Sequence, residues 1–116
     1  MHLALDLDDT ITTWPDAFRL FAQAVRSAGG TVTIITLRRE REPAISDLAR
    51  YEIPYDRLET LPQDRTIDVF EWKAERCSEL AVDVLIDDMP EIANLIAPAT
   101  LVLIPRDPSL GTLTYS

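Results

Sequence analysis

Short apolar runs alternate with amphipathic segments along the chain. Five runs rich in apolar and β-branched residues cover residues 2–7, 31–37, 57–61, 82–87 and 100–104. Their nearly continuous apolar character is typical of strands that are buried on both faces of a sheet. The third run is the weakest, because Pro54 and Pro62 interrupt any regular pattern around it. The pattern therefore predicts five strands.

The segments between these runs have the periodicity of helices. In residues 16–28 the apolar positions form one stripe, which consists of Phe18, Phe21, Ala22, Val25 and Ala28. The pair Gly29-Gly30 predicts the end of that helix. A second helix is predicted over 42–51, with an apolar stripe made of Ile45, Leu48 and Ala49. We expect further helices over about 66–80 and, after Pro90, over 91–96.

The resulting order, βαβαβαβαβ, predicts an α/β fold. Strands that alternate with helices of this length form a parallel sheet with right-handed crossovers. We therefore expect a three-layer α/β/α sandwich around a five-stranded, parallel, Rossmann-like sheet. A chain of 116 residues with 47% apolar residues is enough for one core, so residues 1–116 are expected to form a single domain.

Composition narrows the classes of function. The net charge of −9 argues against broad nucleic-acid binding, which depends on many basic side chains that neutralise phosphates. The single cysteine, Cys77, excludes an intramolecular disulfide framework, and no residues have the spacing of a zinc site. We see no signal peptide and no long apolar stretch. We expect a soluble, cytoplasmic protein without a membrane partner.

Clustered acids follow two of the predicted strands. Asp6, Asp8 and Asp9 end the first apolar run, and Asp87 and Asp88 end the fourth. Crowded carboxylates repel one another unless a cation or a proton offsets the repulsion, and ligands of parallel sheets bind beyond the carboxyl ends of strands. Asp6 and Asp8 face the same way if the strand continues, or surround a shared point if a turn begins near residue 7; both arrangements allow one ligand. Oxygen donors without histidine or cysteine favour Mg²⁺.

The segment Asp6-Leu7-Asp8-Asp9-Thr10 after an apolar strand resembles the first motif of the haloacid dehalogenase (HAD) superfamily. The other motifs follow in order: Thr36 at the end of the second run, Lys73, and the pair Asp87-Asp88. Lys73, the chain's single lysine, lies 14 residues before that pair. The resemblance extends from Leu3 to about residue 104. It implies a hydrolase, a Mg²⁺-dependent phosphomonoester phosphatase that acts through an aspartyl-phosphate.

The resemblance also implies catalytic roles. Asp6 would be the nucleophile, since a carboxylate that attacks phosphorus divides a slow displacement into two easier steps. Asp8 would protonate the leaving oxygen and later activate water. Lys73 would balance the negative charge of Asp6 and the phosphate.

Binding roles follow in the same way. Thr36 and the backbone N–H groups of Leu37 and Arg38 would bind the phosphoryl oxygens of the substrate. Mg²⁺ would be held by Asp6, by the backbone carbonyl of Asp8, and by Asp87 and Asp88, one of these two directly and the other through water. The partner would be a phosphorylated substrate, either a small molecule or a macromolecular end.

Several residues near these motifs allow two interpretations. Arg38, Arg39 and Arg41 are placed to contact a nucleotide or another anion, or form a solvated loop that pairs with Glu40 and Glu42. Trp14, just beyond the first acids, shields the site, stacks on a base or simply packs on the core, and the role of Arg106 after the last strand is similarly open.

The spacing leaves no room for either of the cap insertions found in larger HAD proteins. The protein would be capless, with an open site that takes large substrates or borrows a lid from another subunit, so a homo-oligomer is left open. Alternatives to the phosphatase are a phosphotransferase or nucleic-acid-end phosphatase of the same fold, and a non-catalytic module that binds phosphate or Mg²⁺. A signalling receiver domain also clusters Asp, Thr and Lys around Mg²⁺, but receivers place their paired acids first in the chain.

Overall fold

The computed structural model describes residues 1–98 and 100–105 of the predicted domain 1–116. Residue 99 and residues 106–116, Arg106 included, lie outside the described residues. Its strands are β1 (His2–Leu5), β2 (Thr31–Thr36), β3 (Arg57–Thr60), β4 (Val84–Ile86) and β5 (Leu101–Leu103). Its helices are α1 (Pro15–Ser27), α2 (Arg41–Arg50) and α3 (Val69–Glu79), with two short helical turns, η1 (Leu7–Ile11) and η2 (Pro90–Asn94). The predicted order of strands and helices is confirmed.

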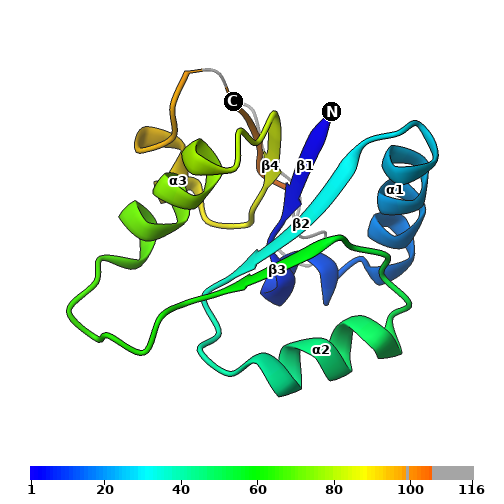
Figure 1. The fold of residues 1–116 in the computed structure, drawn as a ribbon, viewed down its shortest axis with the longest axis horizontal. Coiled ribbons are helices and arrows are strands. Elements are labelled where there is room, and N and C mark those ends of the chain that lie inside the picture. Colours follow the sequence, from blue (N-terminus) through cyan, green and yellow to red (C-terminus); the bar gives the residue numbers. More distant parts are fainter. Residues whose placement is uncertain (99, 106–116) are drawn as a thin grey trace, which may run out of the picture.

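The five strands form one parallel sheet in the order β3-β2-β1-β4-β5. The chain builds one half of the sheet outward from β1 through β2 to β3, and then crosses back to place β4 on the other side of β1 (Figure 1). The direction of winding therefore reverses between β1 and β4. In open α/β sheets, this reversal leaves a crevice at the carboxyl ends of the two strands where ligands bind.

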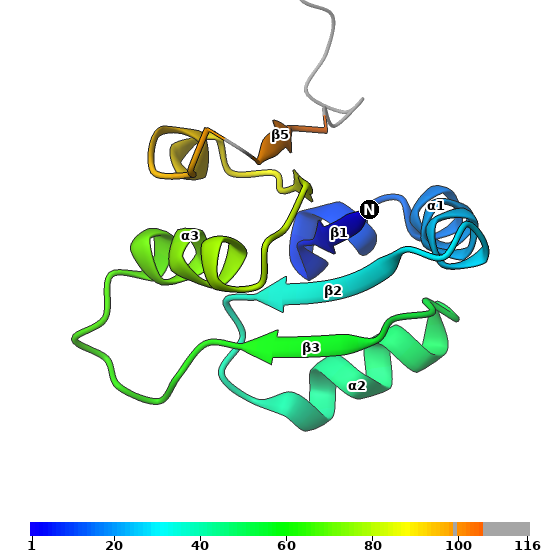
Figure 2. The same ribbon diagram turned by 45° about the horizontal axis from the view of Figure 1, so that its top comes forward.

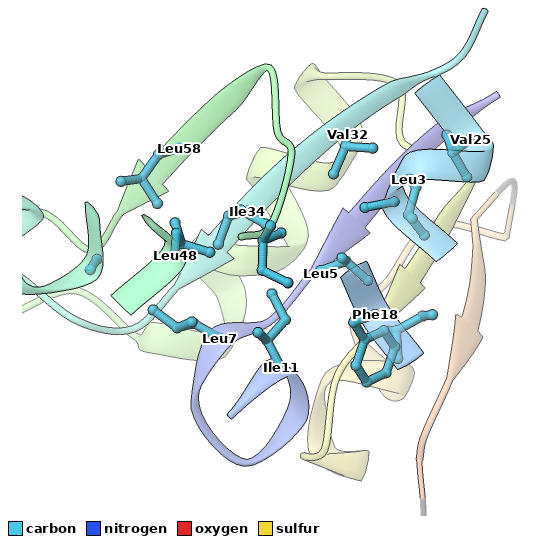
Figure 3. Close-up of a cluster of buried hydrophobic side chains, with 14 residues drawn as sticks. Leu3, Leu5, Leu7, Ile11, Phe18, Val25, Val32, Ile34, Leu48 and Leu58 are labelled. Atoms are coloured by element: carbon cyan, nitrogen blue, oxygen red, sulfur yellow. The ribbon is translucent and has the colours of Figure 1, made fainter. Parts of the chain in front are cut away.

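Helices cover both faces of the sheet, as the predicted three-layer sandwich requires (Figure 2). On one face of the sheet, α1 and α2 cover a buried cluster that includes the strand side chains of Leu3, Leu5 and Ile34 (Figure 3). On the other face, α3 and η2 pack on a second cluster that includes Ala4, Ile35 and Leu85. Neighbouring strand residues thus enter opposite clusters, which explains why these strands are apolar at nearly every position.

Three helices differ in detail from the prediction. The helix expected over 91–96 is a short 3-10 turn, η2, at Pro90–Asn94. The third helix begins at Val69 rather than near residue 66, because the Asp68 carboxylate accepts hydrogen bonds from the backbone N–H groups of Phe70 and Glu71, each at 3.0 Å, and caps the helix there. In α2 the predicted stripe is wrong in part: Ala44 and Leu48 are buried, whereas Ile45 is 36% exposed and Ala49 is exposed. The helix contacts the sheet along the i, i+4 row of small and apolar residues that starts at Ala44.

The end of α1 follows the prediction. Gly29 adopts a positive φ of 86°, and the Gly30 N–H donates to the Val25 carbonyl at 2.8 Å, which closes the last turn of the helix. A Cβ atom on Gly30 would lie 2.7 Å from the Met1 carbonyl oxygen, so this close approach of two backbones requires glycine. Among the described residues, no helix combines the length and apolar character that a membrane span needs.

Candidate active site

The sheet register brings the two acidic clusters together. Leu5, the last residue of β1, pairs with Ile86, the last residue of β4, and the Asp6 N–H donates to the Ile86 carbonyl at 3.0 Å. Asp6 and Asp87 therefore leave the sheet side by side at the reversal of winding. Asp6, Asp87 and Asp88 each offer a carboxylate oxygen, and these three oxygens lie within 4.8 Å of one another.

Lys73 approaches the acids from α3, a helix that packs on one face of the sheet. It occupies the second turn of α3, and its side chain is almost completely buried. Its Nζ donates to Asp6 Oδ1 at 3.0 Å and to Asp87 Oδ2 at 2.6 Å. The predicted contact between this lysine and the acids is therefore present, and no buried side-chain N or O atom of the described residues lacks a partner.

The charges of this group do not balance. Three carboxylates face one ammonium, so two negative charges lack a partner within the group when all four are ionised. Burial raises the pKa of Asp6 to about 8; the Lys73 ammonium opposes this rise, and the nearby Asp87 and Asp88 carboxyls add to it. Burial lowers the pKa of Lys73, but Asp6 and Asp87 outweigh this effect, and that pKa stands above its usual value.

The donor set fits a hard divalent cation. It consists of carboxylate oxygens, and two uncompensated negative charges equal the charge of one such ion. The two oxygens of Asp87 already accept hydrogen bonds, one from Lys73 and one from the Met89 N–H at 2.9 Å. Asp88, which is half-buried, accepts no hydrogen bond from any described residue, so its oxygens are the more available for a metal.

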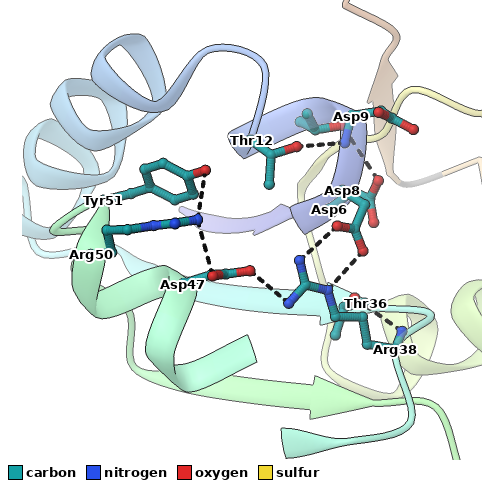
Figure 4. A network of polar contacts seen from close by, with 10 residues as sticks. Asp6, Asp8, Asp9, Thr12, Thr36, Arg38, Asp47, Arg50 and Tyr51 are labelled. Carbon is teal, nitrogen blue, oxygen red and sulfur yellow. Dashed lines mark hydrogen bonds and ion pairs between the residues drawn. The ribbon is translucent and has the colours of Figure 1, made fainter. Parts of the chain in front are cut away.

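Asp8 is placed differently from the other acids. The chain leaves β1 in a single turn, in which Asp9 adopts the left-handed conformation with φ 61°, and Asp8 is not one of the three acids whose carboxylate oxygens lie within 4.8 Å of one another. Of the two geometries left open by the sequence, the structure therefore has the turn. The Arg38 guanidinium binds both Asp8 oxygens, with Nε at 2.9 Å and Nη2 at 2.7 Å (Figure 4).

Arg38 is itself held from a third element. Its Nη1 lies 2.8 Å from Asp47 Oδ2 on α2, and Asp47 in turn accepts from Arg50 at 3.1 Å (Figure 4). Hydrogen bonds to Asp8 and Asp47 raise the pKa of Arg38 above its already high normal value. The result is a chain of charges, Asp8–Arg38–Asp47, that connects η1, the loop after β2 and α2.

Of the predicted substrate-binding residues Thr36, Leu37 and Arg38, Leu37 lines a small cavity beside Asp6. A hollow of about 180 Å³ is lined by Asp6, Asp8, Asp9, Leu37, Asp88 and Met89. Thr36 ends β2 with its side chain buried, and its hydroxyl oxygen accepts from the Arg38 N–H at 3.1 Å. Thr36 thus shapes the loop that carries Leu37 to the cavity, and the Arg38 N–H that was expected to bind a phosphoryl oxygen donates to Thr36 in this structure.

Sequence reasoning missed two residues around this site, Asp47 and Arg65. Asp47 lies on the polar side of a helix, where its charge resembles that of any solvated residue. Arg65 follows a segment with no regular pattern. By contrast, the more modest interpretation of Trp14 holds: it packs against the core and meets Phe18 edge to face, with 6.5 Å between the ring centroids.

Comparison with solved structures shows a shared fold. The chain superposes on a chain from the structure of the Pnkp1/Rnl/Hen1 complex with a TM-score of 0.74, at 20% sequence identity over 90% of its own length. A chain from the Pnkp1/Rnl/Hen1 RNA repair complex gives a TM-score of 0.70 at the same identity and coverage. The chain spans 45% and 42% of the lengths of these two chains. No protein-family model and no curated protein matches the sequence.

Proposed function

We propose that this protein is a Mg²⁺-dependent phosphomonoester phosphatase in which Asp6 is the nucleophile. The observation that carries the proposal is the buried group at the carboxyl edge of β1 and β4, in which Lys73 Nζ contacts both Asp6 and Asp87. A fold seldom buries two carboxylates against one ammonium with a third, half-buried carboxylate beside them, because the desolvation of charges that remain unpaired is costly. A site that receives a divalent cation accounts for the imbalance.

In the proposed reaction, an Asp6 carboxylate oxygen attacks phosphorus and the bond from phosphorus to the ester oxygen breaks. Asp8 delivers a proton to the departing oxygen, and then takes a proton from the water that hydrolyses the aspartyl-phosphate and regenerates Asp6. Lys73 offsets the charge of Asp6 while the dianionic ester binds. Asp6, the Asp8 carbonyl, Asp88 and, through water, Asp87 would hold Mg²⁺, which would supply the positive charge that favours ionised Asp6 and screens the phosphate.

Arg38 has a part in this scheme because it occupies both Asp8 oxygens in the structure. A leaving oxygen needs one of those positions, so Arg38 must release Asp8 when the substrate binds. We propose that the guanidinium then turns to the phosphoryl group, two of whose oxygens can accept the parallel hydrogen bonds that the planar guanidinium donates. Leu37 borders the same cavity.

The direct test is phosphate release from p-nitrophenyl phosphate with and without Mg²⁺. We expect turnover that depends on Mg²⁺ and is lost in Asp6→Asn, which keeps the shape of the side chain but removes the nucleophile. Asp16→Asn is the matched control, because Asp16 is exposed and pairs only with Arg19 on the surface of α1. Absence of turnover on every phosphate ester, together with intact Mg²⁺ binding, would favour a non-catalytic module.

A second candidate within this class is a nucleic-acid-end phosphatase. It is supported by the shared fold with chains from an RNA repair complex, although the likeness covers less than half of those chains. The same assay with 3′- and 5′-phosphorylated oligonucleotides separates it from a phosphatase of small metabolites. We further propose that the domain works without a cap, since α1 follows η1 after a short connection.

A further inference from the structure

Three arginines stand apart from the rest in this acidic protein. Six arginines of the described residues pair with carboxylates, namely Arg19, Arg26, Arg38, Arg50, Arg57 and Arg76. Within residues 1–98 and 100–105, Arg39, Arg41 and Arg65 make no ion pair, so the predicted pairing of this loop with Glu40 and Glu42 is absent there. Hydrogen bonds with Thr66 and the charge of nearby Arg39 lower the pKa of Asp64, so Asp64 offsets Arg39 in part. Guanidinium groups without an ion-pair partner in a chain of net charge −9 are candidate contacts for an anion.

Two of these arginines line one pocket. A hollow of about 540 Å³ is bordered by Leu37, Arg38, Arg39, Glu40, Pro43 and Arg65. Leu37 also lines the smaller cavity beside Asp6, so the two hollows adjoin. Arg38 is already paired with Asp8 and Asp47. Of the other residues that line the pocket, Arg39 and Arg65 are positive and Glu40 is negative, so the lining has an excess of one positive charge.

The pocket is built by hydrogen bonds between two loops. The Leu61 N–H donates to the Arg38 carbonyl at 2.9 Å, and the Gln63 side-chain amide donates to the Arg39 carbonyl at 3.2 Å. The Arg39 guanidinium donates back to the Pro62 carbonyl. The loops after β2 and β3 are therefore held side by side at the carboxyl edge of the sheet, on the flank of the catalytic cavity.

We infer that this pocket is a subsite for the nucleotide next to the reacting phosphate, at the end of a single-stranded nucleic acid. The inference rests on the proposed phosphatase function of Asp6. Arg39 and Arg65 would contact the next phosphodiester, while Leu37 and Pro43 offer apolar surface to the sugar and base, and guanidinium planes stack on bases. A volume of this size accommodates one nucleotide.

The charge distribution favours a strand end over a duplex. A duplex would bring many phosphates against a surface of net negative charge, whereas a strand end places its last two phosphates over the cavity of Asp6 and this pocket. The pocket also explains how an acidic protein can select a polyanion through local contacts.

The test compares kcat/KM for 3′- and 5′-phosphorylated tetranucleotides with kcat/KM for p-nitrophenyl phosphate. We expect one tetranucleotide to be preferred at least tenfold, and the preference to fall at least tenfold in Arg39→Gln/Arg65→Gln. Arg65→Gln alone should lower it several-fold; this variant guards against a folding defect, since Arg65 is exposed and Arg39 supports the loops. Arg26→Gln, which removes an arginine at the far end of α1, should leave the preference unchanged.

Binding of a fluorescently labelled tetranucleotide, measured by anisotropy, separates this inference from the function on which it rests. Binding that is lost in the double variant, in a protein that hydrolyses no ester, supports the subsite and overturns the phosphatase. Hydrolysis of p-nitrophenyl phosphate with the same substrate preference in wild type and double variant overturns the subsite alone. Equal or better use of an acidic phosphopeptide, dependent on both arginines, overturns the nucleic-acid assignment.

Discussion

At the scale of single residues, Lys73 is the group on which the site depends most. It is the largest fully buried side chain of the described residues, and both of its ion-pair partners are buried acids. A buried pair adds little net stability compared with apolar packing, but the loss of one partner leaves the other charge without compensation. Lys73 therefore couples the stability of the core to the chemistry of the site.

We predict that Lys73→Met lowers the free energy of unfolding of the metal-free protein by about 3–5 kcal/mol, because Asp6 and Asp87 lose their counter-charge. Urea unfolding followed by circular dichroism measures the change. The double variant Lys73→Met/Asp87→Asn should recover part of the loss, since it removes one of the two orphaned carboxylates. A single variant as stable as wild type would contradict the buried ion pairs.

Asp6 links metal binding to pH. Its pKa of about 8 in the metal-free site, raised mainly by burial, means that a cation must displace a proton at neutral pH. We predict that Mg²⁺ binding tightens as pH rises to about 8, by up to about tenfold per unit, and then levels off. Isothermal titration calorimetry between pH 6 and pH 9 in buffers of different ionisation enthalpy tests this, because it counts the proton released. Affinity that does not change with pH would exclude the competition.

At the scale of elements, three segments converge on Arg38. The guanidinium connects Asp8 in η1 with Asp47 in α2, so the orientation of α2 against the sheet affects the position of Arg38 at the cavity. The energy of this contact for folding is small, because all three side chains are partly exposed. These contacts instead orient Arg38, since the bidentate contact with Asp8 defines where the guanidinium points before the substrate arrives.

We predict that Asp47→Asn lowers kcat/KM for phosphate esters about tenfold, the equivalent of about 1.4 kcal/mol, while stability changes by less than about 1 kcal/mol. Steady-state kinetics and thermal unfolding together measure both effects. Asp16→Asn makes the same chemical change at the exposed start of α1 and should alter neither quantity. Equal losses of stability and activity would indicate a general disturbance of α2 instead.

At the scale of the whole molecule, the site makes the fold sensitive to pH and metal together. A raised pKa in an acid means that the folded state binds a proton more tightly than the unfolded chain, so the contribution of Asp6 to stability is full below its usual pKa of 3.8. That contribution is lost as pH rises towards about 8. A cation bound to the same oxygens replaces the proton and restores this contribution to stability.

We therefore predict that in EDTA the unfolding temperature falls between pH 5 and pH 8, and that Mg²⁺ raises it more at pH 8 than at pH 5. Differential scanning calorimetry of the full chain measures both trends. Asp6→Asn, which cannot ionise, should be more stable than wild type in EDTA at pH 8 and should lose most of the response to Mg²⁺. An unfolding temperature that rises with pH in EDTA would show that other groups dominate.

The sequence was sufficient for the order of the elements and for the fold class. Apolar runs and helical periodicity are local signals, and they also placed Asp6 and Asp87 at the ends of strands. Element boundaries were less well predicted, as the Asp68 cap shows, because a cap depends on one side chain that competes with weak neighbouring signals. The stripe of α2 was partly wrong because the row that is buried depends on how the helix lies on the sheet.

Residue types and strand pattern are properties of the chain, so they establish which chemical groups lie at the edge of the sheet. Which of these groups are in contact follows from the tertiary structure. The parallel register of β1 and β4 places Asp6 beside Asp87, the packing of α3 brings Lys73 between them, and loop contacts turn Asp8 towards Arg38 and gather Arg39 and Arg65 around a pocket. These contacts join residues that are far apart in the chain, and their geometry follows from tertiary packing that no local sequence pattern encodes.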